Sequence, residues 1–414
     1  MANTTLTADV VAKEALLMLE NELGVLGTIH RAHEDEFATE VNGFKKGSTI
    51  RIRRPADFTV RSGATMDLQD AIEGRTTLAV DTQIGVDFSF TSADLTLSIS
   101  KLSERFIKPA MSAIVNDMAT TCFTSFYQGT YNWAGTPGET INSFADFAKG
   151  AERLDLMAVP TDARCAALHP QDHWGLLGSQ TALYITDAAN GAYREGSLGR
   201  IGGIETYMSQ VLPTHTTGSR DDTTPITAAA AGDQAVSYDT AKNTWTQTLD
   251  TTGFDNAITL TVGDVFTIAD LYMVNPKTKA STGILQQFVV TTAITTDQTD
   301  TLTISPPIIT SGPHQTCVLS TGTFASNALV NVGTASTAYR QNLMYHKNAF
   351  GLACVPMELP PGAYGAARQS YKGFSVRVIP VYDGVNDVSK WRLDMLYGKT
   401  VLDPRLATRV SGTG

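Results

Sequence analysis

One stretch of the chain, from about residue 213 to residue 339, differs in composition from the sequence on either side of it. It is crowded with threonine, and no glutamate occurs between Glu205 and Glu358, whereas both flanks contain glutamate. β-Branched residues favour strands, and clusters of Gly, Pro, Asn and Asp end them. The stretch is therefore predicted to be an all-β module inserted into a chain that otherwise mixes helices and strands.

Short strands are predicted in this module from runs of β-branched and aromatic residues. They cover residues 244–249, 258–262, 265–268, 287–292, 301–304 and 316–319. Because 414 residues are too many for one ordinary core, two or three domains are expected, and this module is one of them.

Charge and composition narrow the possible classes of function. Only 17% of the residues are charged, which suits a protein that covers much of its surface with copies of itself, although a β-rich soluble protein would have the same composition. The net charge of −10 argues against a nucleic-acid-binding protein, because such a protein needs a basic surface to displace counterions.

The sequence carries no targeting signal that we can identify. Its N-terminal part lacks a basic leader followed by a long apolar segment, so no signal peptide is expected. No window approaches about 18 uninterrupted apolar residues, so no membrane span is expected. The four cysteines have no short-range pairs, which excludes a recognisable zinc motif and fits reduced thiols in a cytoplasm.

Residues 7–23 are predicted to form an amphipathic helix. Val11, Ala15, Met18 and Leu19 recur at helical spacing and share one face. This apolar face packs either on the body of its own subunit or on a neighbouring subunit.

Residues 47–91 are predicted to form a long β-hairpin, with strands at 48–55 and 76–91. The connection of about 20 residues is far longer than the usual two to five residues of a hairpin loop. We expect an arm that cannot bury itself against its own domain and therefore rests on a partner. The alternative is a disordered surface loop.

The one local concentration of basic residues lies in this arm, at Arg51, Arg53, Arg54 and Arg61. Arginine pairs bidentately with carboxylates, so these side chains are candidates for contact with an acidic patch on another subunit. The alternative is an arm whose charges are simply solvated.

The remaining sequence mixes helices and strands. The longest predicted helix covers 100–128, and Pro109 lies in its first turns. Asp383-Gly384 is a hairpin-type turn signal between two strongly alternating strands. The other predicted helices cover 143–157 and 171–178, and the other strands cover 164–168, 204–212, 340–356, 373–382 and 391–401, with residues 402–410 as a final strand or an extended tail.

No catalytic or cofactor site emerges from the motifs. His169, Asp172 and His173 are the best candidates for a metal site, but His169 precedes a proline outside the helix and no third ligand is spaced nearby. The glycines of residues 199–203 precede a strand, so they are interpreted as loop residues and not as a phosphate cradle. The paired aspartates at 221–222 and at 297 and 300 lack the calcium-loop pattern.

The order of elements resembles that of the major coat proteins of tailed bacteriophages with the Hong Kong 97-type capsid fold. More narrowly, it resembles the short-tailed-phage coat family, whose members carry an inserted β-barrel-like domain. The sequences that carry the resemblance are LHPQD at 168–172, GRIGG at 199–203, VGDVFTI at 262–268 and YHKNAF at 345–350.

The resemblance implies an α+β fold divided in a particular way. The expected parts are an N-terminal arm at 1–46, a projection called the E-loop at 47–91, a peripheral domain with a spine helix at 92–168, the first part of an axial domain at 169–213, the inserted β-domain at 214–339, and the completion of the axial and peripheral domains at 340–414.

The resemblance also implies a structural subunit that is not an enzyme and has no cofactor or metal. Copies would assemble as hexamers and pentamers into an icosahedral shell, enclosing double-stranded DNA without sequence-specific binding. The implied partners are a scaffolding protein, a portal protein and, as a further candidate, a decoration protein, with no membrane. The implied location is the virion capsid, and the host cytoplasm during assembly. The E-loop arginines would then contact a neighbouring subunit, and Val11, Ala15, Met18 and Leu19 would pack the N-terminal arm.

Two other interpretations of the chain's function stay open. An encapsulin-like compartment shell shares the fold but encloses an enzyme, and the inserted β-domain argues against it. A hydrolase or carbohydrate-binding protein with an accessory β-domain would need a nucleophile or convergent acids, and none is evident. Some relatives of the capsid fold form a covalent Lys–Asn crosslink, but no catalytic acid is evident beside Lys45, Lys46 and Asn42, so no crosslink is predicted.

Overall fold

The computed structural model describes most of the chain, and its residues cluster into two compact units. Unit 1 comprises Met1–Ile50, Thr77–Cys122 and Phe350–Thr400, and unit 2 comprises Arg51–Thr76, Phe123–Ala349 and Val401–Gly414. The described residues are 11–15, 24–33, 37, 40–41, 44–45, 47–66, 68–91, 103–180, 198–220, 226–228, 234–297, 299–320, 324, 326–362, 365–371 and 374–413.

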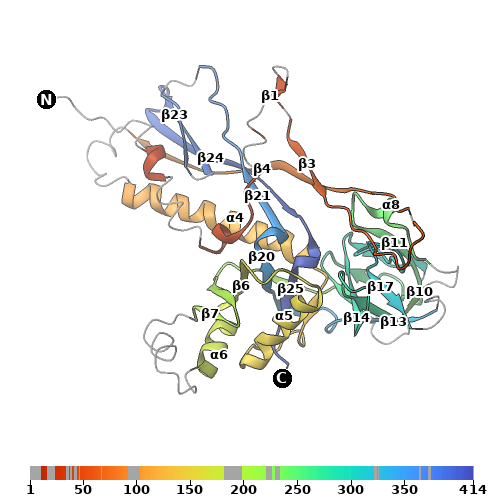
Figure 1. Ribbon diagram of the computed structural model, residues 1–414. Helices are drawn as coiled ribbons and strands as arrows, with labels where there is room; N and C mark the ends of the chain where they lie inside the picture. The colour runs from red at the N-terminus through yellow and green to blue at the C-terminus, as the bar shows by residue number, and fades with distance from the viewer. Residues whose placement is uncertain are drawn as a thin grey trace. The chain divides into compact units, whose positions relative to one another are not determined.

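Unit 1 is built on a sheet with the strand order β22-β23-β24-β4-β3, and β21 also pairs with β24 (Figure 1). The pairing of β23 with β24 confirms the hairpin predicted at Asp383-Gly384. Long antiparallel ladders of this kind give every interior backbone group a partner. The strands are β3 (Thr49–Arg54), β4 (Gly74–Thr91), β21 (Phe350–Cys354), β22 (Ala367–Tyr371), β23 (Phe374–Asp383) and β24 (Val388–Val401).

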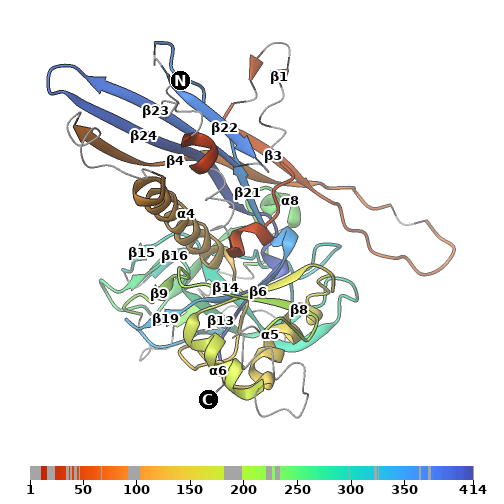
Figure 2. The ribbon, with the colours of Figure 1, turned by 90° about the vertical axis from the view of Figure 1, so that its left-hand side faces the viewer.

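The predicted long helix is present as η2 (Ser103–Ile107) followed by α4 (Lys108–Gly129). The part of α4 in unit 1 runs beside β4 and β24 (Figures 1 and 2). Burial is the main cause that raises the pKa of the Tyr397 phenol on β24. The electrostatic effect of Cys122, near the end of this part of α4, raises it further. Val11 and Ala15 are buried in a helical stretch at 11–15, and Met18 and Leu19 lie outside the described residues.

Unit 1 also contains short elements near the N-terminus. They are η1 (Gly24–Thr28), β1 (Glu40–Val41) and β2 (Phe44–Lys45). His30 forms an isolated parallel bridge with Gly351. The guanidinium of Arg31 lies 4.4 Å from the ring centre of Phe374.

Unit 2 contains a mixed sheet with the order β5-β25-β20-β6-β8-β7. We call these six strands the axial sheet as a label only, without assigning them to a domain. Its strands β6 and β8 are parallel and so are β25 and β5, whereas β20 is antiparallel to both of its neighbours. Its elements are β5 (Trp133–Ala134), β6 (Arg164–Leu168), β7 (Arg200–Ile201), β8 (Ile204–Met208), β20 (Asn342–His346) and β25 (Ala407–Val410), with helices α5 (Phe144–Leu156) and α6 (Pro170–Gln180) and turns η3 (Lys347–Ala349) and η4 (Pro404–Leu406).

The strands of the predicted all-β module form a closed barrel in unit 2. The order β14-β16-β11-β10-β18-β13 returns to β14, and β17 adds to the other half of β13. Closure leaves few free strand edges. The strands are β10 (Ile226–Ala228), β11 (Gln247–Thr252), β13 (Val265–Val274), β14 (Ser281–Val290), β16 (Thr299–Ser305), β17 (Cys317–Leu319) and β18 (Ala328–Asn331), with β12 (Thr259–Leu260), β15 (Ile294–Thr295) and helix α8 (Tyr238–Ala241) beside them.

The barrel is joined to the axial sheet by a two-stranded stem. The chain enters it through β9 (Thr214–Thr216) and leaves through β19 (Ala338–Arg340), and these two strands pair antiparallel. Val265, Met273 and Val289 of the barrel belong to the same apolar cluster as the axial core. The barrel therefore shares buried surface with the body of unit 2. No helix in the described part of the chain combines the length and apolarity needed to cross a bilayer.

Candidate functional site

The most unusual surface of the molecule is the loop between β3 and β4, residues 55–73, which we call the projecting loop (Figure 2). Four of its large apolar side chains are exposed: Phe58 by 59%, Val60 by 99%, Met66 by 73% and Leu68 by 83%. Phe58 and Val60 are two residues apart, as are Met66 and Leu68, so each pair can point to one side of an extended segment.

The tip of the projecting loop is held by its own hydrogen bonds. The Gln69 amide accepts from the backbone N–H of Thr59 at 2.8 Å and donates to the Thr59 carbonyl at 2.6 Å. Arg61 donates to the carbonyl of Thr65 at 3.0 Å across the turn at Gly63, whose φ of +100° favours glycine. The exposed apolar side chains are therefore presented on a closed loop.

The base of the projecting loop is fixed by Arg54 at the end of β3. Its Nε donates to Thr76 Oγ1 at 2.8 Å, and its Nη2 donates to the Leu402 carbonyl at 3.1 Å. Its guanidinium lies 5.2 Å from the ring centre of Trp245, and the guanidinium of Arg405 lies 5.4 Å from that ring. Burial lowers the pKa of Arg54, with Asp403 opposing the shift.

A second set of contacts joins the loop to α8 and the barrel. Asp57 Oδ2 lies 3.4 Å from His314 Nδ1, and the His314 ring stacks on Tyr238 at 3.5 Å. Ile72 packs against the cluster that contains Tyr238 and Trp245. A Cβ on Gly74 would lie 2.5 Å from the Lys242 carbonyl oxygen, so the chain approaches too closely for any other residue without movement. The base of the loop is thus packed on its own chain.

These contacts bear on the expectation that the arm cannot bury itself against its own domain and rests on a partner. The base of the loop rests on the predicted all-β module of the same chain, which supplies Trp245, Tyr238 and His314 as a surface. The reason is that the module, remote in sequence, folds beside the base of the loop. For the tip, where the apolar side chains are exposed, contact with a partner stays a prediction.

The four predicted contact arginines have different surroundings. Arg51, Arg53 and Arg61 are exposed, and Arg53 lies 3.7 Å from Glu73 in an ion pair between exposed side chains. Arg54 is half-buried and hydrogen-bonded within its own chain. An exposed ion pair contributes little, about 0–1 kcal/mol, so Arg53 stays available for another molecule at small cost, whereas Arg61 also donates to the Thr65 carbonyl of its own loop.

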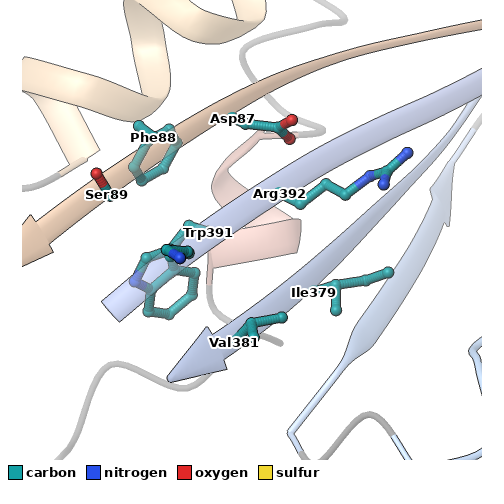
Figure 3. Close-up of a pocket in the computed structure, with 8 residues that line it drawn as sticks. Asp87, Phe88, Ser89, Ile379, Val381, Trp391 and Arg392 are labelled. Carbon is teal, nitrogen blue, oxygen red and sulfur yellow. The ribbon is translucent and has the colours of Figure 1, made fainter. Parts of the chain in front are cut away.

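Unit 1 carries a groove of about 380 Å³ on its sheet (Figure 3). Cross-strand register places Ile379, Arg392 and Asp87 side by side on one face, opposite to that of the buried Leu393. The groove has room for a few apolar side chains beside charged ones. It is lined by Asp87, Phe88, Ser89, Ile379, Val381, Lys390, Trp391 and Arg392.

The cluster considered as a metal site has another role. Asp172 is fully buried in α6, where it accepts from the backbone N–H of Ile141 at 2.9 Å, from Arg340 Nε at 3.1 Å and from Asn342 Nδ2 at 3.0 Å. Among the described residues no group of three or more potential metal ligands comes together. Asp172 therefore joins α6, the loop before α5 and the end of the barrel stem.

The residues that sequence reasoning missed are Trp245, Tyr238, His314 and Arg405, which fix the base of the projecting loop. No local motif marks them, because their partners are distant in sequence. The available signals were two large aromatic residues in a threonine-rich module and an apolar Ile72 in an otherwise polar connection.

Comparison with known proteins gives a consistent result. The sequence profile of the family described as P22 coat protein, gene protein 5, matches residues 4–412. A protein named major capsid protein, from Acyrthosiphon pisum secondary endosymbiont phage 1, is 24% identical over 391 residues, covering 90% of each chain. A solved chain from Mycobacterium phage Che8 is 12% identical and covers 93% of this chain and 90% of that chain with a TM-score of 0.50, which shows a shared fold.

Proposed function

The chain belongs to the P22 coat protein family and is a phage major capsid protein that forms an icosahedral shell, and we propose that its projecting loop binds a neighbouring copy. The observation that carries this proposal is the exposure of Phe58, Val60, Met66 and Leu68 on a loop whose tip is closed by its own hydrogen bonds. Exposed apolar clusters of this kind mark interaction sites.

The energetics favour a second copy as the occupant. Fully burying a large apolar side chain contributes about 1.5–3 kcal/mol, and four of them together can offset part of the entropy lost on association. The firm base reduces that entropy cost, because Arg54 and Trp245 order the start of the loop before any partner arrives. Arg51, Arg53 and Arg61 would add charge contacts at the rim of the interface, where they affect specificity and rate more than affinity.

The arrangement of copies follows from the kind of contact. A loop that binds a different surface on the next copy makes a head-to-tail interface, and such an interface closes into a ring when the rotation from copy to copy closes. We place the copies in hexamers and pentamers, formed in the host cytoplasm with a scaffolding protein and completed with a portal protein. A decoration protein is a further candidate partner. In this proposal the shell is non-enzymatic, holds double-stranded DNA without reading its sequence and forms no Lys–Asn crosslink at Lys45, Lys46 or Asn42.

Residues 47–91 would act as the E-loop and residues 214–339 as the inserted domain of the subunit. In the same assignment, 1–46 is the N-terminal arm, 92–168 the peripheral domain, and 169–213 with 340–414 the axial domain and the completion of both. The support is that every barrel strand from β10 to β18 lies between residues 226 and 331. The stem of β9 and β19 marks where the inserted domain leaves and rejoins the axial sheet.

Electron microscopy of the overexpressed chain, alone and with its co-encoded scaffold, tests this proposal. Closed shells of uniform size with the scaffold, and fewer or irregular shells without it, are the expected result. A folded chain that stays monomeric at every concentration and salt tested, with and without scaffold, would contradict it.

A further inference from the structure

A single arginine on β25 lies at the junction between the barrel and the end of α4 within unit 2. Arg409 is fully buried, and its guanidinium donates to three main-chain carbonyls. Nη2 bonds to Tyr127 at 2.5 Å, Nε bonds to Thr130 at 3.0 Å, and Nη1 bonds to Gly263 at 2.9 Å. The first two carbonyls belong to the last turn of α4 and the residue after it, and the third belongs to the barrel.

These bonds give partners to carbonyls at a buried junction, and the Tyr127 carbonyl also accepts from the backbone N–H of Thr130 at 3.1 Å. The last carbonyls of a helix have no partner within the helix, and a cation near them also interacts favourably with the helix dipole. The rings of Tyr127 and Trp133 lie 5.3 and 5.2 Å from the guanidinium carbon. Burial lowers the pKa of Arg409 to about 9, so it remains charged at neutral pH.

The barrel contributes one tight turn to this junction, residues 261–264 between β12 and β13. Gly263 has a φ of +103°, and a Cβ there would come within 3.1 Å of the Tyr127 ring. Asp264 is buried and accepts from His215 Nε2 at 3.0 Å, from the backbone N–H of Gly218 at 3.1 Å and from that of Thr261 at 2.8 Å. The turn is therefore fixed from the stem by Asp264 and from the axial sheet by Arg409.

A second polar contact holds the barrel in the same position. The Gln287 side chain accepts from the backbone N–H of Trp133 at 2.6 Å and donates to the Trp133 carbonyl at 3.0 Å. Between the two polar contacts the interface is apolar, with Val265, Met273 and Val289 in the shared core. Apolar surfaces alone tolerate small shifts in position, whereas a three-carbonyl fork is satisfied in one geometry only.

We propose that Arg409 is a positioning residue that seats the inserted barrel on the end of α4 in one orientation. The barrel has its own closed hydrogen-bond ladders and core, so its folding does not require this arginine. What the arginine supplies is a fixed relation between the turn at 261–264 and the segment at 127–130. A subunit without the guanidinium would keep a folded barrel, but the barrel would be held less firmly against the end of α4.

Hydrogen exchange, measured on the unassembled full chain, tests the proposal with the variant Arg409→Lys. Lysine keeps the positive charge but lacks the planar guanidinium that binds three carbonyls at once. The expected result is exchange about tenfold faster or more at the amides of Gly263, Asp264 and Thr130, with less than threefold change in the β11–β16 ladder. Equal acceleration everywhere would mean general destabilisation and would overturn the proposal, as would no change at the junction. Arg409→Met is the companion variant if lysine reaches all three carbonyls. Gln287→Met, which removes both the acceptor of the Trp133 backbone N–H and the donor to the Trp133 carbonyl, is expected to speed exchange at Trp133 and leave Thr130 unchanged.

Because the measurement uses single subunits, its outcome is independent of whether the projecting loop binds a neighbour. The consequence for assembly does rest on that proposed function. With the barrel loosely seated, the base of the projecting loop, which packs on Trp245 and His314, is held less firmly. Arg409→Lys shells are then expected to be irregular in size. If the variant exchanged faster at the junction but still formed uniform shells like those of the wild type, the consequence for assembly would be refuted and the positioning role of Arg409 would stand.

Discussion

Replacing Arg54 by glutamine removes the guanidinium that fixes the base of the projecting loop. The variant loses the bond to Thr76 Oγ1, the bond to the Leu402 carbonyl and the contact with the Trp245 ring. A hydrogen bond from a charged group contributes about 1.5–3 kcal/mol and an Arg–Trp contact about 0.5–2 kcal/mol. Arg54 is only half-buried and glutamine retains one donor, so the expected loss is at the lower end, about 2–4 kcal/mol.

That loss corresponds to a local opening constant about 30 to 700 times larger. Hydrogen exchange of segments 54–58, 72–76 and 238–245 measures it, since the loop base and α8 meet there. Arg53→Gln is the matched control, because Arg53 is the neighbouring residue and its side chain is 85% exposed. It is expected to change exchange less than threefold. If the two variants behaved alike, Arg54 would not be the anchor of the loop.

Three further perturbations have defined outcomes. Val60→Asp should keep the thermal midpoint of the unassembled subunit within about 1 °C of the wild-type value and should abolish shell formation, measured by sedimentation. Ser62→Asp in the same loop is the control and should still assemble. Normal shells from Val60→Asp would exclude the tip as a contact between copies. Burial lowers the pKa of His215 below 6.5, with the Asp264 hydrogen bond opposing, so the folded state favours the neutral ring; the stability that this provides is present above about pH 6.5 and is lost as pH falls below it. His215→Asn should therefore flatten the fall in melting temperature between about pH 7 and pH 5, and an unchanged fall would disprove the role of this ring. Asp172→Ala should cost about 3–5 kcal/mol in urea unfolding, because two buried donors and the partly buried Arg340 lose their acceptor, and a loss below about 1 kcal/mol would contradict this role of Asp172.

Local signals in the sequence predicted much of the fold. The α+β fold of the Hong Kong 97 type is confirmed, and so are the hairpin at Asp383-Gly384 and the long helix with Pro109 in its first turn. These features depend on short-range periodicity and turn chemistry, which a single sequence contains. Strand β13 was predicted too short, since Asp270 has a φ of +63° at an irregularity and the strand continues beyond it.

The site was less accessible from sequence because its contacts join distant segments. Nothing near Arg54 indicates that Trp245 lies over it, and the four arginines of the arm look equivalent in sequence although the structure gives Arg54 a separate role. Asp172 was considered as a metal ligand, but its partners Ile141 and Asn342 come from other elements, and only the folded chain shows it as a hydrogen-bond acceptor. Such roles follow from tertiary topology, which spacing does not encode.

The projecting loop is anchored at its base by its own subunit, and we propose that its tip binds another copy. A photo-crosslinking amino acid at position 60, where the side chain is 99% exposed, tests the contact of the tip in assembled shells. Adducts between two copies are expected in the shell fraction, and none are expected in dilute unassembled subunit. Adducts confined to single chains in both fractions would contradict it.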